Sequence, residues 1–311
     1  MKFQLERIVG GTESQRAEAL DDIRSNFESQ SPEIMVEMEV EKTQEEIEYI
    51  RIADEVALII LRNYGIDTDS IPNGKFHALK IEVWPENIPD SPAFFSSFRQ
   101  SIFYKEGTPG LFLIHNLIHE IIHFKSYQAA QITTENSLTD YRVGLTVATR
   151  DGKTDQFRNL NEAITEDLTY EAMQTQEFRE LAQDKIKEKE SLIQAFDRQH
   201  NLDMNKESDP SVFYVEVLEG EAHAPIRLDQ YEFTYKKERE GLRILIDKLL
   251  EKNKDLFTAP EDVRMLFVKS AFSGDLLEIG RLIEKTFGKG TFRKIAENDS
   301  EDDFLNFVRA L

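Results

Sequence analysis

The sequence of 311 residues contains no cysteine. Disulfide bonds and thiolate ligands are therefore excluded, and any transition-metal site must be built from histidine, aspartate and glutamate. No uninterrupted apolar run of about 18 residues is present either, so we expect no membrane span. The N-terminal stretch MKFQLERIVGG lacks the apolar core of a signal peptide. These absences together predict a cytoplasmic protein.

Basic residues are the minority among the charged side chains. There are 38 Lys and Arg residues against 59 Asp and Glu residues, which gives a net charge of −21. Binding to nucleic acid requires clustered basic side chains, and no such block occurs, so we expect no nucleic-acid partner. The same charge would repel an anionic membrane surface, and we expect no membrane partner. A hydrophobic content of 40% nevertheless fits a folded globular protein.

What the sequence does contain is the motif HEIIH, inside the apolar run LFLIHNLIHEIIHF. His119 and His123 are four residues apart, so on a helix both imidazoles can reach one metal ion. Glu120 lies beside them, where it can accept a proton from a metal-activated water. Thr108 and Pro109 predict the start of this helix, as the cap and the first helical residue. Buried His and Glu side chains are costly unless they are paired or bind a metal, which favours a metal site.

His115 extends the same face of this helix by one turn. His115 and His119 also have the spacing of a metal-binding pair. Only the pair of His119 and His123 has a glutamate in the position of the base. We therefore interpret His115 as a residue that lines the pocket or supports the structure.

A second helix is predicted to supply the third ligand. It follows an Asp-Gly hairpin signal at 150–153 and begins in NEAITE, residues 161–166. Glu162 and Glu166 are one helical turn apart and share a face. Two neutral imidazoles and one carboxylate leave a position open on a zinc ion, which is the arrangement of a catalytic site.

HEIIH followed by NEAITE resembles the gluzincin zinc metallopeptidases, the thermolysin-like group, whose pattern is HExxH, a spacer, and NExxS/T followed by an acid. The resemblance implies that His119, His123 and Glu162 bind Zn²⁺ and that Glu120 is the general base. It also implies that Asn161 and Glu166 accept hydrogen bonds from the ligand imidazoles.

The resemblance covers about residues 111–172. The spacer between His123 and Glu162 is longer than in thermolysin, and Glu166 stands where that family has aspartate. Catalysis also needs a donor to the oxyanion, for which the motif indicates no residue. The candidates are Tyr141, Tyr170, His223, Tyr231 and Tyr235. Among them we favour His223 and Tyr235, because a C-terminal helical region forms the far wall of such a cleft.

The rest of the sequence alternates helix and strand signals. Helices are predicted over 12–30 and 43–64, and strands over 33–41, 77–85 and, as one or two strands, 93–107. SVFYVEVLEG fits either a strand or the start of a helix, and the chain from Tyr231 onward is predicted to be helical.

These elements predict an α+β protein with a zincin-like catalytic domain and a helical C-terminal subdomain. We expect an N-terminal region over 1–75, a catalytic core over 76–200 and the mainly helical subdomain over 201–311.

The leading hypothesis is a zinc metallopeptidase, a hydrolase that acts on a peptide or protein substrate. An alternative is a non-catalytic or narrowly specific regulatory protein that keeps the zinc site and binds a protein partner. A third possibility is a helical scaffold in which HEIIH binds no metal. The sequence does not indicate the oligomeric state.

Overall fold

The structure of the chain is a computed structural model. It describes residues 5–28, 37–86, 88, 91–200, 212–218, 227–298 and 300–311. Within these ranges, helices combine with three separate β-sheets. The mixed α+β class predicted from the sequence is therefore confirmed.

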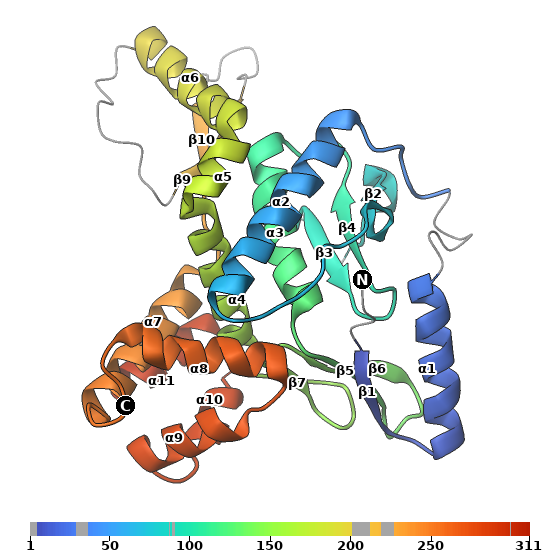
Figure 1. The fold of residues 1–311 in the computed structure, drawn as a ribbon, viewed down its shortest axis with the longest axis vertical. Helices are drawn as coiled ribbons and strands as arrows, with labels where there is room; N and C mark the ends of the chain where they lie inside the picture. The colour runs from blue at the N-terminus through green and yellow to red at the C-terminus, as the bar shows by residue number, and fades with distance from the viewer. Residues whose placement is uncertain are drawn as a thin grey trace.

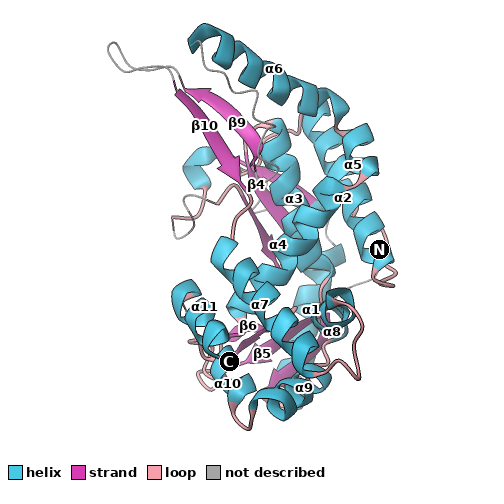
Figure 2. Cartoon of the chain, turned by 90° about the vertical axis from the view of Figure 1, so that its left-hand side faces the viewer, coloured by secondary structure: helices cyan, strands magenta, loops and turns pink. Residues whose placement is uncertain are grey.

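One buried helix occupies the centre of the fold. This helix, α3 (Gly110–Lys125), carries the HEIIH motif, and twelve of its sixteen residues are buried. It packs against α2 (Gln44–Asn63) and α4 (Arg158–Gln174), which lie beside it in both ribbon views (Figures 1 and 2). Since apolar side chains cover nearly all of its surface, α3 is stable only in such surroundings.

The start of α3 differs from the sequence prediction. Thr108 is not the cap and Pro109 is not the first helical residue, because the helix begins at Gly110 and Pro109 is its N-cap. The hydroxyl of Thr108 donates instead to the carbonyl of Lys105, 2.6 Å away. That hydrogen bond closes the preceding turn and removes the side chain from the helix.

The helices with capping boxes form where they are predicted. At α2, Thr43 Oγ1 accepts the N–H of Glu46 at 3.1 Å, and Glu46 Oε2 accepts the N–H of Thr43 at 2.7 Å. Thr12 and Gln15 make the equivalent exchange at α1 (Glu13–Glu28). Each exchange satisfies two backbone donors that the helix itself leaves free.

A three-stranded sheet lies beside the motif helix. It contains β2 (Phe76–Leu79), β3 (Ala93–Ser96) and β4 (Ser101–Lys105). The order is β2-β4-β3, with β3 at one edge and antiparallel to β4.

Two strand predictions near this sheet are only partly met. The strand predicted over 77–85 ends at Leu79, and a 3₁₀ turn follows at Ile81–Val83, where Glu106 accepts the N–H of Ile81 at 3.0 Å. Of the strand predicted over 33–41, residues 33–36 lie outside the described ranges, and Glu39 forms only an isolated bridge to Leu79.

A second, five-stranded sheet lies below the first in Figure 1. Its order is β1-β5-β6-β7-β8, and only the pair β1–β5 is parallel. The strands are β1 (Leu5–Gly10), β5 (Gln128–Ile132), β6 (Leu138–Val143), β7 (Thr146–Ala148) and β8 (Asp155–Gln156). The turn predicted at 150–153 joins β7 to β8 as an antiparallel pair. This hairpin leads directly into α4.

The third sheet is the antiparallel pair β9 (Val212–Leu218) and β10 (Arg227–Glu232). Within SVFYVEVLEG, residues 212–218 therefore form a strand. The prediction of helix from Tyr231 onward is wrong, because Tyr231 pairs with Tyr214 across this ribbon. Two helices precede the ribbon, α5 (Gln176–Leu181) and α6 (Gln183–His200).

Five helices form the end of the chain, below α4 in Figure 2. They are α7 (Lys236–Lys252), α8 (Pro260–Ser273), α9 (Leu277–Phe287), α10 (Thr291–Ala296) and α11 (Glu301–Ala310). Ser300 caps α11, accepting the N–H of Asp303 at 3.1 Å. One hydrophobic cluster joins residues from all three predicted regions, among them Ile50, Leu117 and Phe304. The division into regions stays a prediction. Among the described helices, none combines the length and apolarity needed to cross a membrane.

Candidate metal centre

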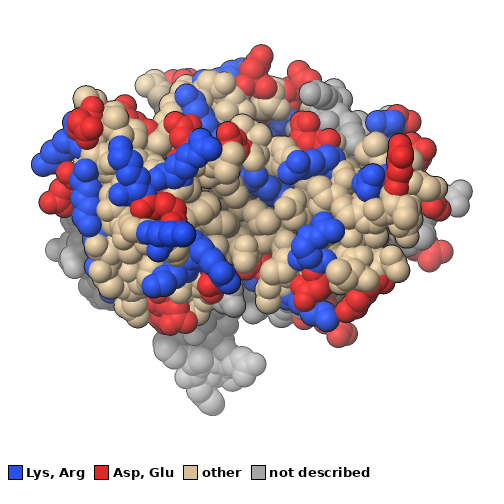
Figure 3. Space-filling view, turned by 90° about the horizontal axis from the view of Figure 1, so that it is seen from below, with Lys and Arg blue, Asp and Glu red and all other residues tan. Residues whose placement is uncertain are grey.

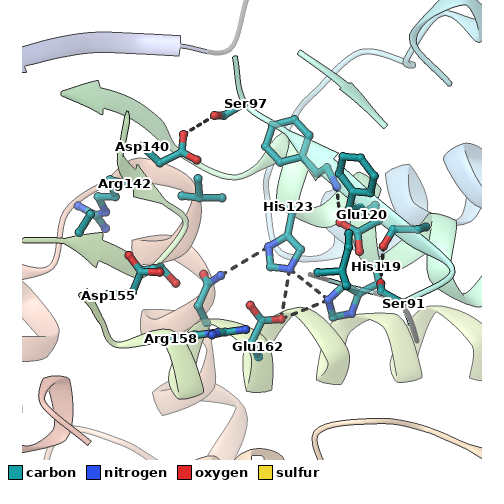
Figure 4. Close-up of a pocket in the computed structure, with 18 of the residues that line it drawn as sticks. Ser91, Ser97, His119, Glu120, His123, Asp140, Arg142, Asp155, Arg158 and Glu162 are labelled. Atoms are coloured by element: carbon teal, nitrogen blue, oxygen red, sulfur yellow. Dashed lines mark hydrogen bonds and ion pairs between the residues drawn. The ribbon is translucent and has the colours of Figure 1, made fainter. Parts of the chain in front are cut away.

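Helices α3 and α4 bring the three predicted ligands together (Figure 4). The Nε2 atoms of His119 and His123 are 3.1 Å apart. Oε2 of Glu162 lies 3.4 Å from each of them. The exposed fraction is 6% for His119 and 9% for His123. Two turns of α3 and the facing turn of α4 thus form a small triangle of nitrogen and oxygen atoms.

This triangle has the dimensions of one face of a tetrahedral metal site. Metal–nitrogen bonds of about 2.0–2.1 Å with tetrahedral angles place ligand atoms about 3.4 Å apart. The three residues form a group that could bind a metal ion, since all their ligand atoms lie within 4.8 Å of one another. Two imidazole nitrogens that face each other at 3.1 Å need either a shared proton or a cation between them. The donors therefore fit a divalent metal.

Glu166 orients His119, one of the three predicted ligands. Its Oε2 lies 2.9 Å from His119 Nδ1, and its side chain is fully buried. In the neutral ring, Nδ1–H donates to the carboxylate and Nε2 keeps a lone pair directed toward the triangle. Burial lowers the pKa of His119, but hydrogen bonds to Glu162 and Glu166 outweigh burial and raise that pKa well above 6.5. The second proton of the charged ring is on Nε2, and a metal bound there would have to displace it.

Asn161 stands behind His123, although not in the expected orientation. Its Oδ1 accepts the N–H of Leu145 at 2.8 Å, and its Nδ2 lies 3.5 Å from His123 Nδ1. Gly144, with φ of +59°, lets the backbone approach so closely that a Cβ there would lie 2.3 Å from Asn161 Oδ1. The amide is thus fixed by the turn between β6 and β7, and its oxygen faces Leu145 rather than His123.

The predicted base lies beside the ligands and against the edge strand. Glu120 Oε2 accepts the N–H of Phe95, in β3, at 2.9 Å. No hydrogen bond to Oε1 is present among the described residues. Burial raises the pKa of Glu120, while positive charge on His119 and His123 lowers it, and the net shift is upward. A base with a raised pKa accepts protons more readily near neutral pH.

A cavity of about 420 Å³ opens onto these residues. Tyr235 lines it, and its ring stacks on His119 with centroids 5.6 Å apart and planes 16° apart. Burial raises the pKa of Tyr235 above its usual value, and the charges of Glu162 and Glu120 raise it further. The phenol therefore keeps its proton and can act as a hydrogen-bond donor in the cavity.

The other candidate donors divide into three groups. Tyr141 also lines the cavity. Tyr231 and Tyr170 lie elsewhere: the hydroxyl of Tyr231 donates to Glu216 at 3.0 Å, and the ring of Tyr170 contacts Phe233. His223 lies outside the described residues.

Several residues of the site were not predicted from the sequence. Arg158, at the start of α4, is exposed and lines the cavity, and no ion pair to it occurs in the described part of the chain. Asp140, Arg142 and Asp155 lie on the side of the cavity away from Glu120 (Figure 4). One feature of the sequence could have indicated Arg158 as a site residue: it precedes Glu162 by four residues and so shares its helix face. The residues on β6 and β8 had none, since the chain folds back to reach the site.

Comparisons of the chain with protein-family models, with curated proteins and with solved structures found no match.

Proposed function

We propose that the chain is a zinc-dependent metallopeptidase with a gluzincin-like site in a zincin-like domain. One observation carries the proposal. The side chains of His119, His123 and Glu162 converge at 3.1–3.4 Å beside Glu120, at the wall of an open cavity. A structural zinc site would have four protein ligands and no cavity, whereas three ligands leave room for substrate.

A zinc ion held by these three residues would supply Lewis acidity, polarising a carbonyl and making a water more acidic. The protein's own part begins with Glu120, whose carboxylate lines the cavity beside the three ligands, where it can accept a proton from that water. The hydrogen bond from the N–H of Phe95 to Oε2 holds the carboxylate in place, so Oε1 is the oxygen that we expect to take the proton. The same group then delivers the proton to the leaving amine.

Strand β3 is suited to bind the substrate backbone. It is the edge strand of its sheet, and Phe94 and Phe95 line the cavity. The backbone N–H of Phe95 donates to Glu120, so this N–H points away from β4 and toward the site. Outward backbone groups on an edge strand can pair with an extended peptide. Such pairing would place a peptide bond next to Glu120.

Tyr235 is our choice for the oxyanion donor. It lines the cavity, stacks on His119 and keeps its proton. A donor fixed in place before the reaction stabilises developing negative charge without having to reorganise.

The substitution Glu120→Gln tests the proposal. The amide keeps the size of the side chain but cannot accept the proton, so we expect zinc binding to persist and hydrolysis to fall roughly 10²- to 10⁴-fold. Zinc is measured by elemental analysis of the purified protein, and hydrolysis with a diverse peptide library. His123→Ala is the companion variant and should bind no zinc.

Full zinc-dependent activity in Glu120→Gln would show the mechanism to be wrong. A wild-type protein that binds zinc but cleaves no peptide would favour the regulatory, partner-binding alternative. A wild-type protein without metal would exclude both.

A further inference from the structure

Glu166 has more hydrogen-bond partners than the orientation of one ligand requires. Its side chain is fully buried on α4. Oε2 accepts from His119 Nδ1 at 2.9 Å, whereas Oε1 lies 3.0 Å from His115 Nε2 and accepts the N–H of Thr234 at 2.8 Å. A buried carboxylate is costly unless donors surround it, and these three groups supply them.

His115 is held so that it faces this carboxylate. It lies on α3 one turn before His119, and its exposed fraction is 2%. Its ring stacks on Phe213 of β9, with centroids 4.1 Å apart and planes 18° apart, and meets Phe233 edge to face at 5.3 Å. His115 is absent from the residues that line the cavity. It therefore has no route to a substrate in the cavity except through other side chains.

We infer that His115 is a positioning residue, which acts through Glu166 to hold the metal ligand His119. The terminal torsion of a glutamate is soft. A donor on Oε1 therefore restricts the direction in which Oε2 points, and hence the orientation of the His119 ring. This inference rests on the proposed function only in requiring that His119 bind a metal.

The same carboxylate connects His119 to the cavity wall. Thr234, which donates to Oε1, immediately precedes Tyr235, whose ring stacks on His119. Glu166 thus fixes the ligand and the backbone of the proposed oxyanion donor at once. The ring of Phe213 contacts both His115 and Phe233, which connects His115 to the ribbon of β9 and β10.

The test compares three substitutions of His115 by the dissociation constant of Zn²⁺, measured by competition with a chelating dye. His115→Leu removes the donor and keeps an apolar side chain of similar bulk. His115→Gln can place an amide N–H near the position of Nε2, whereas the shorter His115→Asn cannot. Because outer-shell partners of metal ligands typically contribute 10- to 100-fold in affinity, we expect about a tenfold loss for Leu and Asn. We expect Gln to remain within about threefold of wild type.

A spectroscopic measurement separates positioning from general support of the fold. With Co²⁺ in place of Zn²⁺, the visible absorption of the metal reports the ligand geometry. We expect the Leu and Asn variants to change this spectrum and the Gln variant to retain it. Phe304→Leu is the matched control, because it removes a buried ring on α11 that has no part in holding His115 or Glu166. It should lower the free energy of unfolding with little effect on zinc affinity.

Equal zinc affinity in all three His115 variants would overturn the inference, and so would equal losses for Gln and Asn. If His115→Leu does not fold, the comparison of Gln with Asn still decides, since both are polar and differ in reach. None of these measurements uses hydrolysis. A protein that binds zinc without cleaving peptides therefore contradicts the proposed function and leaves this inference standing.

Discussion

Arg158 is the cavity arginine whose side chain forms no hydrogen bond or ion pair with the described part of the chain. The other cavity arginine, Arg142, donates from Nε to the carbonyl of Gly144 at 2.8 Å and from a terminal nitrogen to that of Ser270 at 3.2 Å. It also donates to the carbonyl of Gly274. Arg158 has no ion pair within the described ranges and shares a helix face with Glu162. A substrate carboxylate would find its partner here.

We predict that Arg158→Ala reduces the preference for acidic substrates. Hydrogen bonds to a charged group contribute about 1.5–3 kcal/mol when well formed, and the exposure of Arg158 places the effect at the lower end. For a pair of peptides that differ by Asp against Asn near the cleaved bond, the ratio of kcat/KM should fall about tenfold. Arg158→Lys keeps the charge and should retain part of the preference. An unchanged ratio in the Ala variant would mean that Arg158 does not contact substrate.

Residues within one helix were predictable, and residues that meet across the fold were not. His119 with His123, and Glu162 with Glu166, need only the period of a helix to place them on one face. Tyr235 was one of five candidates, because nothing local indicates that its left-handed backbone, with φ of +52°, directs it onto His119. Phe95 could not be predicted, since its contribution is a backbone N–H, which every residue except proline has.

At the scale of elements, the turn between β6 and β7 sets the position of α4 relative to the sheet. Gly144 has φ of +59°, a region that other residues rarely occupy. Its N–H donates to the carbonyl of Tyr127 at 2.8 Å, and the next N–H, of Leu145, donates to Asn161 of α4. Asn161 in turn stands behind His123 on α3. One turn therefore links the five-stranded sheet to α3 and α4, the two helices that carry the proposed ligands.

We predict that Gly144→Ala destabilises the protein and weakens metal binding. The new Cβ would lie 2.3 Å from Asn161 Oδ1, so the amide must move. The backbone strain alone costs on the order of 1–3 kcal/mol. Urea unfolding and zinc titration measure the two effects.

Gly74→Ala is the matched control for this substitution. No atom lies within 4 Å of a Cβ at Gly74, so its effect on the free energy of unfolding should stay within about 0.5 kcal/mol. If the two variants unfold alike and bind zinc alike, the turn has no role in the site.

The helix and strand predictions were accurate where the residues that determine an element lie close to it in the sequence. Helices α1 and α2 have capping residues within their own first turn, and their starts were predicted correctly. The strand expected over 77–85 was cut short by a carboxylate 25 residues away, that of Glu106. Alternation of apolar residues does not reveal such a partner.

The charge of the whole molecule is divided unevenly along the chain. Residues 236–311 contain 15 basic and 15 acidic side chains, so the net charge of −21 arises from residues 1–235. The face seen from below shows Lys and Arg interspersed with Asp and Glu (Figure 3). Residues 1–235 and residues 236–311 form ion pairs with each other at α4. Asp167 pairs there with Arg239 at 3.4 Å and with Arg264 at 3.2 Å.

Ion pairs and hydrogen bonds with the C-terminal residues therefore fix the position of α4. Arg264 also pairs with Glu171 at 2.6 Å, and Asn159 donates to the carbonyls of Asn298 and Ser300 at 2.9 and 3.1 Å. The opposite side of α4 presents Glu162 to the two histidines of α3. A metal bound there would join two helices of one continuous core, so its binding should stabilise the whole chain.

We predict that zinc raises the thermal unfolding midpoint of the metal-free protein. A ligand present at about 1,000 times its dissociation constant adds roughly 4 kcal/mol to the free energy of unfolding. With an entropy of unfolding of about 2.1 cal/mol/K per residue, that corresponds to a shift of about 6 °C for a chain of this length. Glu120→Gln should show the same shift and His123→Ala none, because His123 is a proposed ligand and Glu120 is not. An equal shift in His123→Ala would place the metal elsewhere.

The size of this shift should also depend on pH. The pKa of His119 is raised above 6.5, so its proton stabilises the metal-free fold below about pH 6.5 and that contribution is lost as the pH rises through the raised pKa. Zinc requires the deprotonated ring and therefore binds more tightly as the pH rises. The pKa of Glu162 is lowered, which keeps this ligand ionised throughout. Scanning calorimetry from pH 6 to 8.5 should show the difference between the zinc-bound and metal-free midpoints widening with pH, and a constant difference would rule out His119 as the ligand that exchanges its proton for the metal.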